Sequence, residues 1–79
     1  MWRVSVILNC ISVDATTFST FKEAWDYSRL FPSLDDPTYD MWRYRPKKEV
    51  EDEFGVSGCV SVRVSWTDEM EVWISTRRD

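Results

Sequence analysis

The chain has 79 residues, enough for one small domain and too few for two. Its 10 basic and 14 acidic side chains give a net charge of −4, which disfavours broad binding to nucleic-acid phosphates. With no histidine and only two cysteines, the sequence lacks the commonest general base, a disulfide framework and a four-ligand zinc site.

The first predicted element is a strand over 2–10, because its even positions are apolar while Arg3, Ser5 and Asn9 occupy odd ones. A signal peptide over 1–15, with Arg3 as its charged region and Val4 to Val13 as its apolar one, is the alternative, but its removal would take away much of a small core. Cys10 and Cys59 are predicted to be small buried residues in reduced form, and a bridge between them is the alternative.

A loop over 14–19 is predicted to lead into a helix with the sequence TFKEAWDYSRLF. Thr20 fits an N-cap and Glu23 completes a capping box, while Pro32 ends the run. Apolar residues recur at helical spacing, so this helix has one side to bury. That side carries Phe21, Ala24, Trp25, Ser28 and Phe31.

The opposite side of this helix is expected to face solvent. It carries Lys22 and Asp26, four residues apart and able to form a modest ion pair, together with Arg29. The following segment 32–40 contains two prolines and reads as a loop.

Residues 41–45 alternate aromatic and arginine side chains, which predicts a strand with Trp42 and Tyr44 on one face. Pro46 should limit this strand. No second strong helix is expected unless 47–54 supplies a short one.

A hairpin is predicted from two further alternating segments, 56–66 and 70–75. In the first segment Val60, Val62, Val64 and Trp66 are expected to point inward. The favoured register pairs Trp66 with Val72 and Val64 with Ile74 across an odd-numbered loop centred on Glu69. An even-numbered loop, which places Trp73 opposite Val64, is the alternative.

These elements predict one α+β domain over 1–79, in the order strand, helix, strand, strand, strand. Its simplest form is a two-layer structure, with one helix packed on a mainly antiparallel sheet of three to four strands. No segment is long and apolar enough to cross a membrane, and a cytoplasmic location is expected.

The sequence offers little for catalysis, and we expect no enzymatic activity and no cofactor. It has no phosphate-binding glycine loop and no nucleophile motif. The aspartates Asp35 and Asp36, like the acids of 49–53, lack the alternating oxygen ligands of a calcium loop, so no metal site is expected. Direct nucleic-acid binding is disfavoured, with the basic and aromatic stretch Trp42 to Lys48 as the one exception.

Acidic residues concentrate outside the longest apolar elements, and they are the candidate partner-binding residues. If their loops converge, the carboxylates present spaced negative charge to a basic groove on another protein. The alternative is that they only keep the loops hydrated. The candidates are Glu49, Glu51, Asp52, Glu53, Asp35, Asp36, Asp68, Glu69 and Glu71.

In its length, its acidity and its single α+β domain without a catalytic constellation, the chain resembles the small phage-encoded inhibitors grouped as anti-CRISPR proteins. That group shares no motif, so no functional residue carries over. The resemblance implies a stoichiometric inhibitor that binds a CRISPR effector complex and blocks access to DNA.

Two functional hypotheses follow, with the oligomeric state open in both. The first is a non-enzymatic inhibitor, a DNA mimic that occupies the basic groove of a larger protein or ribonucleoprotein, with Tyr39 or Trp73 as an apolar anchor. The second is a structural or adaptor module that binds a protein through a sheet edge or an exposed apolar face.

Overall fold

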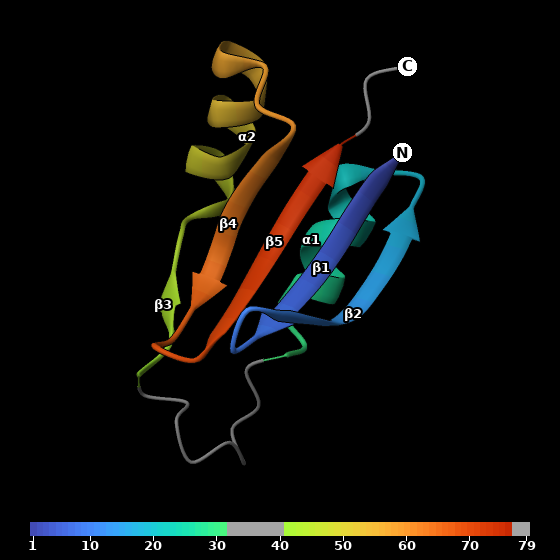
Figure 1. The fold of residues 1–79 in the computed structure, drawn as a ribbon. Helices are drawn as coiled ribbons and strands as arrows, with labels where there is room; N and C mark the ends of the chain where they lie inside the picture. Colours follow the sequence, from blue (N-terminus) through green and yellow to red (C-terminus); the bar gives the residue numbers. More distant parts are fainter. Residues whose placement is uncertain (32–40, 77–79) are drawn as a thin grey trace.

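Residues 1–31 and 41–76 are described by the computed structural model, which shows an α+β fold (Figure 1). The sheet is antiparallel, open and five-stranded, with strand order β2-β1-β5-β4-β3. The α+β class and the antiparallel sheet are confirmed. The predicted strand number, single helix and element order are wrong, because one strand was missed and the segment 47–54, left open as a short helix, does form one that continues to Ser57. The elements are β1 (Trp2–Leu8), β2 (Ile11–Phe18), α1 (Phe21–Ser28), β3 (Arg43–Tyr44), α2 (Lys47–Ser57), β4 (Ser61–Trp66) and β5 (Met70–Thr76).

The missed strand is β2, which pairs with β1 as a hairpin where a loop over 14–19 was expected. Asn9 and Cys10 form the turn with φ of 48° and 68°, the positive values of a two-residue turn of the type that joins twisted strands. Cys10 is therefore exposed at the tip, not buried, and Cys59 is half-buried. Both thiols are free, so the alternative bridge between them is not formed.

Helix α1 begins as predicted. Thr20 is the N-cap, its Oγ1 accepting from the Glu23 N–H at 3.2 Å and donating to Glu23 Oε1 at 3.0 Å. Ala24 and Ser28 are fully buried, so the predicted buried face is confirmed. The helix ends at Ser28, three residues before the expected end.

The segment after the undescribed residues 32–40 is less regular than predicted. Strand β3 is two residues long, and Trp42 is buried whereas Tyr44 is exposed, so they do not share a buried face. Pro46 does limit the strand and becomes the N-cap residue of α2. This second helix ends at Gly58, whose φ of 61° suits a residue without a side chain.

The β4–β5 hairpin is confirmed, but the favoured register is wrong. Thr67 N–H donates to Met70 O at 2.8 Å across a two-residue turn, Asp68 and Glu69, so the loop is even-numbered as in the alternative. A bulge between Arg63 and Ser65 then shifts the pairing. As a result the pairs are Val62 with Ile74, Arg63 with Trp73, Ser65 with Val72 and Trp66 with Glu71.

The bulge also changes which side chains of β4 are buried. Val62 and Val64 are buried as predicted, but Ser65 is buried too and Trp66 is only half-buried. Val60 was expected to point inward, yet it precedes the strand and is 56% exposed.

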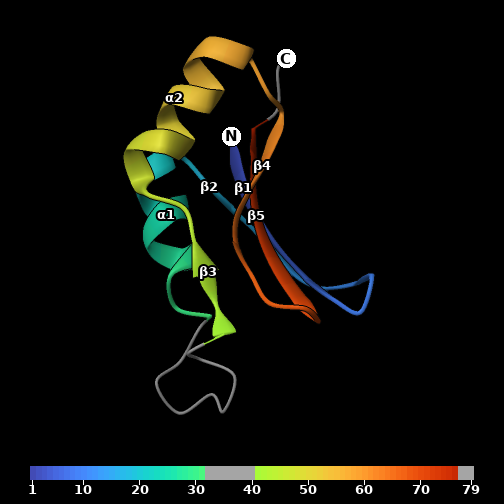
Figure 2. The same cartoon turned by 90° about the vertical axis from the view of Figure 1, so that its left-hand side faces the viewer.

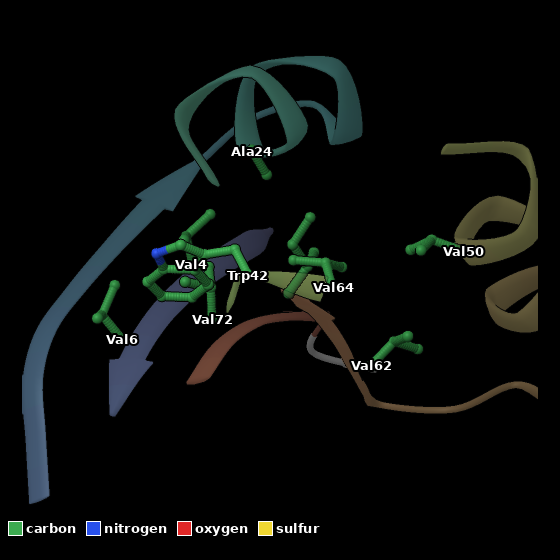
Figure 3. Packing of buried hydrophobic residues seen from close by; sticks show 9 residues of the cluster. Val4, Val6, Ala24, Trp42, Val50, Val62, Val64 and Val72 are labelled. Atoms are coloured by element: carbon green, nitrogen blue, oxygen red, sulfur yellow. The ribbon is translucent and has the colours of Figure 1, made fainter. Parts of the chain in front are cut away.

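Both helices lie on the same side of the sheet (Figure 2). Between them and the strands is a core made mostly of valines, and Figure 3 shows Ala24 and Val50 pointing from the two helices toward it. Partly buried rings surround this core, so large aromatic area supplements a small aliphatic centre. Neither described helix is long and apolar enough to cross a membrane.

Candidate functional site

The acidic residues of α2 are largely paired. Arg45 donates from Nε and Nη2 to Glu49 Oε1 at 3.0 and 2.8 Å, and Nη2 also donates to Glu53 Oε2. The Glu53 hydrogen bond is the largest of the interactions that raise the pKa of Arg45 above its ordinary value, with Glu49 adding to it. One guanidinium thus neutralises two of the four carboxylates of this helix.

The other two carboxylates of α2 are more open. Glu51 Oε1 lies 3.9 Å from Lys47 Nζ, a loose pair with both side chains more than two-fifths exposed. Asp52 is exposed and has no ion pair within the described residues. The candidate acids of α2 therefore offer one unpaired carboxylate.

The acids of the β4–β5 hairpin lie at the opposite end of β4. Helix α2 leads into the start of this strand and the turn follows its end, as Figure 1 shows, so the two groups are separated by about 20 Å of strand. Asp68 and Glu69 are exposed in the turn, whereas Glu71 Oε1 accepts from Arg63 Nη1 at 2.8 Å. The structure does not bring the α2 acids and the turn acids together.

Several of the predicted binding residues lie outside the described residues: Asp35, Asp36 and the candidate anchor Tyr39. The other candidate anchor, Trp73, is half-buried on the sheet face away from the helices, where it lines a shallow hollow with Ile7 and three serines. Its indole N–H is buried without a hydrogen-bond partner within the described residues.

The basic stretch from Arg43 to Lys48 is also partly neutralised. Arg45 is held by two glutamates and Lys47 lies near Glu51. Arg43 and Lys48 are exposed and form no salt bridge with another described residue, so two separate cations remain rather than a continuous basic track.

Arg29, which the helical pattern placed in solvent, instead ties α1 to β3 and β4. Its guanidinium lies 3.9 Å from the Trp25 ring centroid and 5.0 Å from that of Tyr44. It donates to Ser65 Oγ at 3.2 Å and to the Arg45 carbonyl at 2.6 Å. Burial lowers the pKa of Arg29, with the Tyr44 interaction opposing the shift. All four of these contacts are made to other residues of the same chain, so we interpret Arg29 as a residue that stabilises the fold.

Within the described chain, the outer edge of β2 is the surface best suited to pairing with another strand. This strand has eight residues, pairs with β1 on one side only, and carries one charged side chain, Asp14. Ile11 and Val13 are 67% and 53% exposed. Sequence analysis missed this surface although its β-branched residues and the preceding Asn9 were available signals.

The described residues contain no group of three or more side chains placed to hold a metal ion. No protein-family model matches the sequence, no curated protein matches it, and no solved structure matches the fold. The geometry of the chain itself therefore carries the functional argument.

Proposed function

We propose that the protein is a non-catalytic binding module that adds an extended segment of another chain to the outer edge of β2. The observation that carries this proposal is the eight-residue edge, with one charge and two exposed aliphatic side chains. An edge of this kind presents unpaired backbone donors and acceptors that another strand can satisfy. This proposal takes up the adaptor hypothesis from the sequence and assigns it to the β2 edge.

Three features of the fold support the proposal. The helices form a layer on one face, so the edge is approached without displacing them. Asp14, the one charged side chain of the strand, accepts a hydrogen bond from the Tyr27 hydroxyl at 2.8 Å and is thereby held toward α1. The two free thiols suit a reducing, cytoplasmic location.

The test compares Thr17→Pro with Thr17→Val in affinity capture from a lysate of the native host. Proline at this position removes a donor from the outer edge, whereas valine keeps the backbone and nearly the same shape. We expect a protein that wild type and Thr17→Val both capture and that Thr17→Pro loses. Identical captured proteins for all three would contradict edge binding.

An acidic inhibitor that docks on a cationic partner is the second candidate, and one observation favours it at the turn. Asp68 and Glu69 border a hollow lined by apolar side chains, including Leu8 and Trp42. The aliphatic stem of a lysine or arginine fits such a hollow while its charge meets the carboxylates.

This second candidate has its own discriminating pair of variants. Reversal of Asp68 and Glu69 to lysine should abolish capture of a basic partner, and reversal of Glu51 and Asp52 should not. Both double variants leave Glu53 with Arg45, so they avoid the ion pair most needed by α2. Unchanged capture by the turn variant would contradict acidic docking at this end of the sheet.

A further inference from the structure

We propose that the strand received by β2 is β2 of a second copy of this chain, paired antiparallel about a two-fold axis. This inference rests on the proposed function and deepens it by naming the partner. The two five-stranded sheets would join into one continuous ten-stranded antiparallel sheet.

The direction of the backbone groups shows which residues are available. The Asn9 N–H donates to Glu69 O at 2.8 Å, so the odd-numbered residues on this side of the hairpin bond toward β5. The even residues of β1 then bond to β2, where Val4 faces Thr16 and Trp2 faces Phe18. The intervening Ala15 and Thr17 consequently direct their N–H and C=O groups outward.

These two outward residues make the edge self-complementary. With the axis at Thr16, Ala15 of each copy faces Thr17 of the other, and each facing pair can exchange two backbone hydrogen bonds. The pairing lies beyond the irregularity between Val6 and Ile7 of β1, so it uses the regular half of β2.

Charge favours a second copy at this edge over any other part of the surface. The chain carries a net charge of −4, so most of its surface repels another copy. From Ile11 to Phe18 the only charged residue is Asp14, which is half-buried and bonded to Tyr27. With the axis at Thr16, Asp14 of each copy faces Phe18 of the other, so the two carboxylates are not placed opposite each other, and a basic peptide would find a single anionic group along this strand.

An aromatic rim beside the strand adds area that a symmetric partner can cover. Tyr27 lies over β2, its ring centroid 5.0 Å from Phe18 and 5.1 Å from Phe31, and all three rings are half-buried. A two-fold axis normal to the sheet places both α1 helices on the same face. The two rims then flank the new strand pair and add apolar burial to its hydrogen bonds.

The first test measures the oligomeric state by sedimentation equilibrium from micromolar to submillimolar protein. Wild type and Thr17→Val should dimerise, and Thr17→Pro should weaken the dimer by at least about tenfold. Circular dichroism of the three proteins checks that each is folded. A monomeric wild type over the whole range, or an equally dimeric Thr17→Pro protein that is folded, would overturn the proposal.

The second test measures geometry without altering the edge. Cys10 is exposed at the hairpin tip and lies six positions before Thr16, about 20 Å from the proposed axis at the usual rise per residue. A Cys59→Ser protein labelled with a nitroxide at Cys10 should therefore give a distance of about 40 Å in pulsed electron spin resonance. A dimer with the two labels close together would overturn the antiparallel arrangement.

The outcomes also separate this inference from the proposed function. A monomeric protein that still captures a different chain, lost with Thr17→Pro, would overturn self-pairing and keep edge binding. If Thr17→Pro captures the same proteins as wild type while the spin labels lie about 40 Å apart, self-pairing would stand and binding of other chains at this edge would be overturned.

Discussion

The two edges of the sheet are built in opposite ways. At one edge β3 is two residues long, contains Arg43, and is followed by Arg45 and Pro46. Short length, positive charge and proline are the devices by which sheet proteins keep an edge from pairing. At the other edge β2 has eight residues and neither lysine nor proline. Within one sheet, then, the β3 edge combines three protective devices, whereas the β2 edge has only the pairing irregularity near Asp14.

The difference extends to how each edge is held. The β3 edge depends on long side chains, because Arg29 joins α1 to the Arg45 carbonyl and to Ser65. The β2 edge is held by a backbone ladder to β1 with one irregularity, between Val6 and Ile7, and by Tyr27, which contacts Asp14 and Thr16. The β3 edge should therefore be destabilised when a side chain is removed, whereas the β2 edge should be destabilised when its turn or its backbone is changed.

The largest expected effect is at the β3 edge, from Arg29→Ala. It removes two hydrogen bonds from a cation and two ring contacts, and should lower the free energy of unfolding by about 3 kcal/mol. Urea denaturation measures this loss. Arg29→Lys keeps the charge but not the planar fork and should lie between, whereas Lys22→Ala removes only an exposed pair with Asp26 and should change stability far less. A loss for Arg29→Ala no larger than for Lys22→Ala would show that the anchor is unimportant.

A gain is expected at the β2 side from Cys10→Gly. Cys10 is exposed with φ of 68°, so glycine relieves backbone strain without losing packing, and unfolding should cost about 1 kcal/mol more. Thermal or urea unfolding measures the gain. Cys59→Ser serves as the control for removing a thiol elsewhere. A destabilised Cys10→Gly protein would contradict the assigned turn.

A similar or slightly smaller gain is expected in α2 from Gly55→Ala. A methyl group at this helical position would meet no atom within 4 Å, so alanine should add helix propensity worth about 0.5–1 kcal/mol. Gly58→Ala is the matched control and should destabilise, because Gly58 has a φ of 61°. Equal effects of the two substitutions would contradict the observed end of α2.

The smallest expected effect concerns the ion pairs beside the β3 edge. Glu53→Gln should lower stability by about 0.5–1 kcal/mol through its partly shielded contact with Arg45, and Asp52→Asn should have no measurable effect. The difference should shrink in high salt, since screening weakens exposed pairs. Equal losses for both variants would show that the Arg45 contact contributes nothing specific.

The features that could be predicted from sequence are those set by local rules. The Thr20 cap, the buried face of α1, the alternation of β1 and the limit at Pro46 each depend on a few neighbouring residues. The β4–β5 hairpin was also recognisable, because both of its strands alternate. Local pattern thus identified most elements by type.

The features that could not be predicted depend on the rest of the fold. The bulge near Val64 changes the register for tertiary reasons, since it brings Ser65 inward to accept from Arg29. The same contact explains why Arg29, on the polar side of a helical pattern, is half-buried. The β2 strand was missed because Cys10 stands where the usual turn glycine is expected.

The candidate binding site, like the fold, could be predicted from the sequence only in part. The sequence identified the acidic residues, but it could not show that Glu49 and Glu53 share Arg45 or that the hairpin-turn acids lie at the other end of β4. Predicting that β2 is an exposed edge strand would have required the order of the strands in the sheet, which no single segment of the sequence determines.

The hydrogen bond from the Asn9 amide to Glu69 O links the tips of two hairpins. Turn amides normally exchange with deuterium from solvent quickly, whereas this one is shielded while β1 and β5 stay together. The deuterium uptake of Asn9 is therefore a built-in reporter of whether the two central strands have separated.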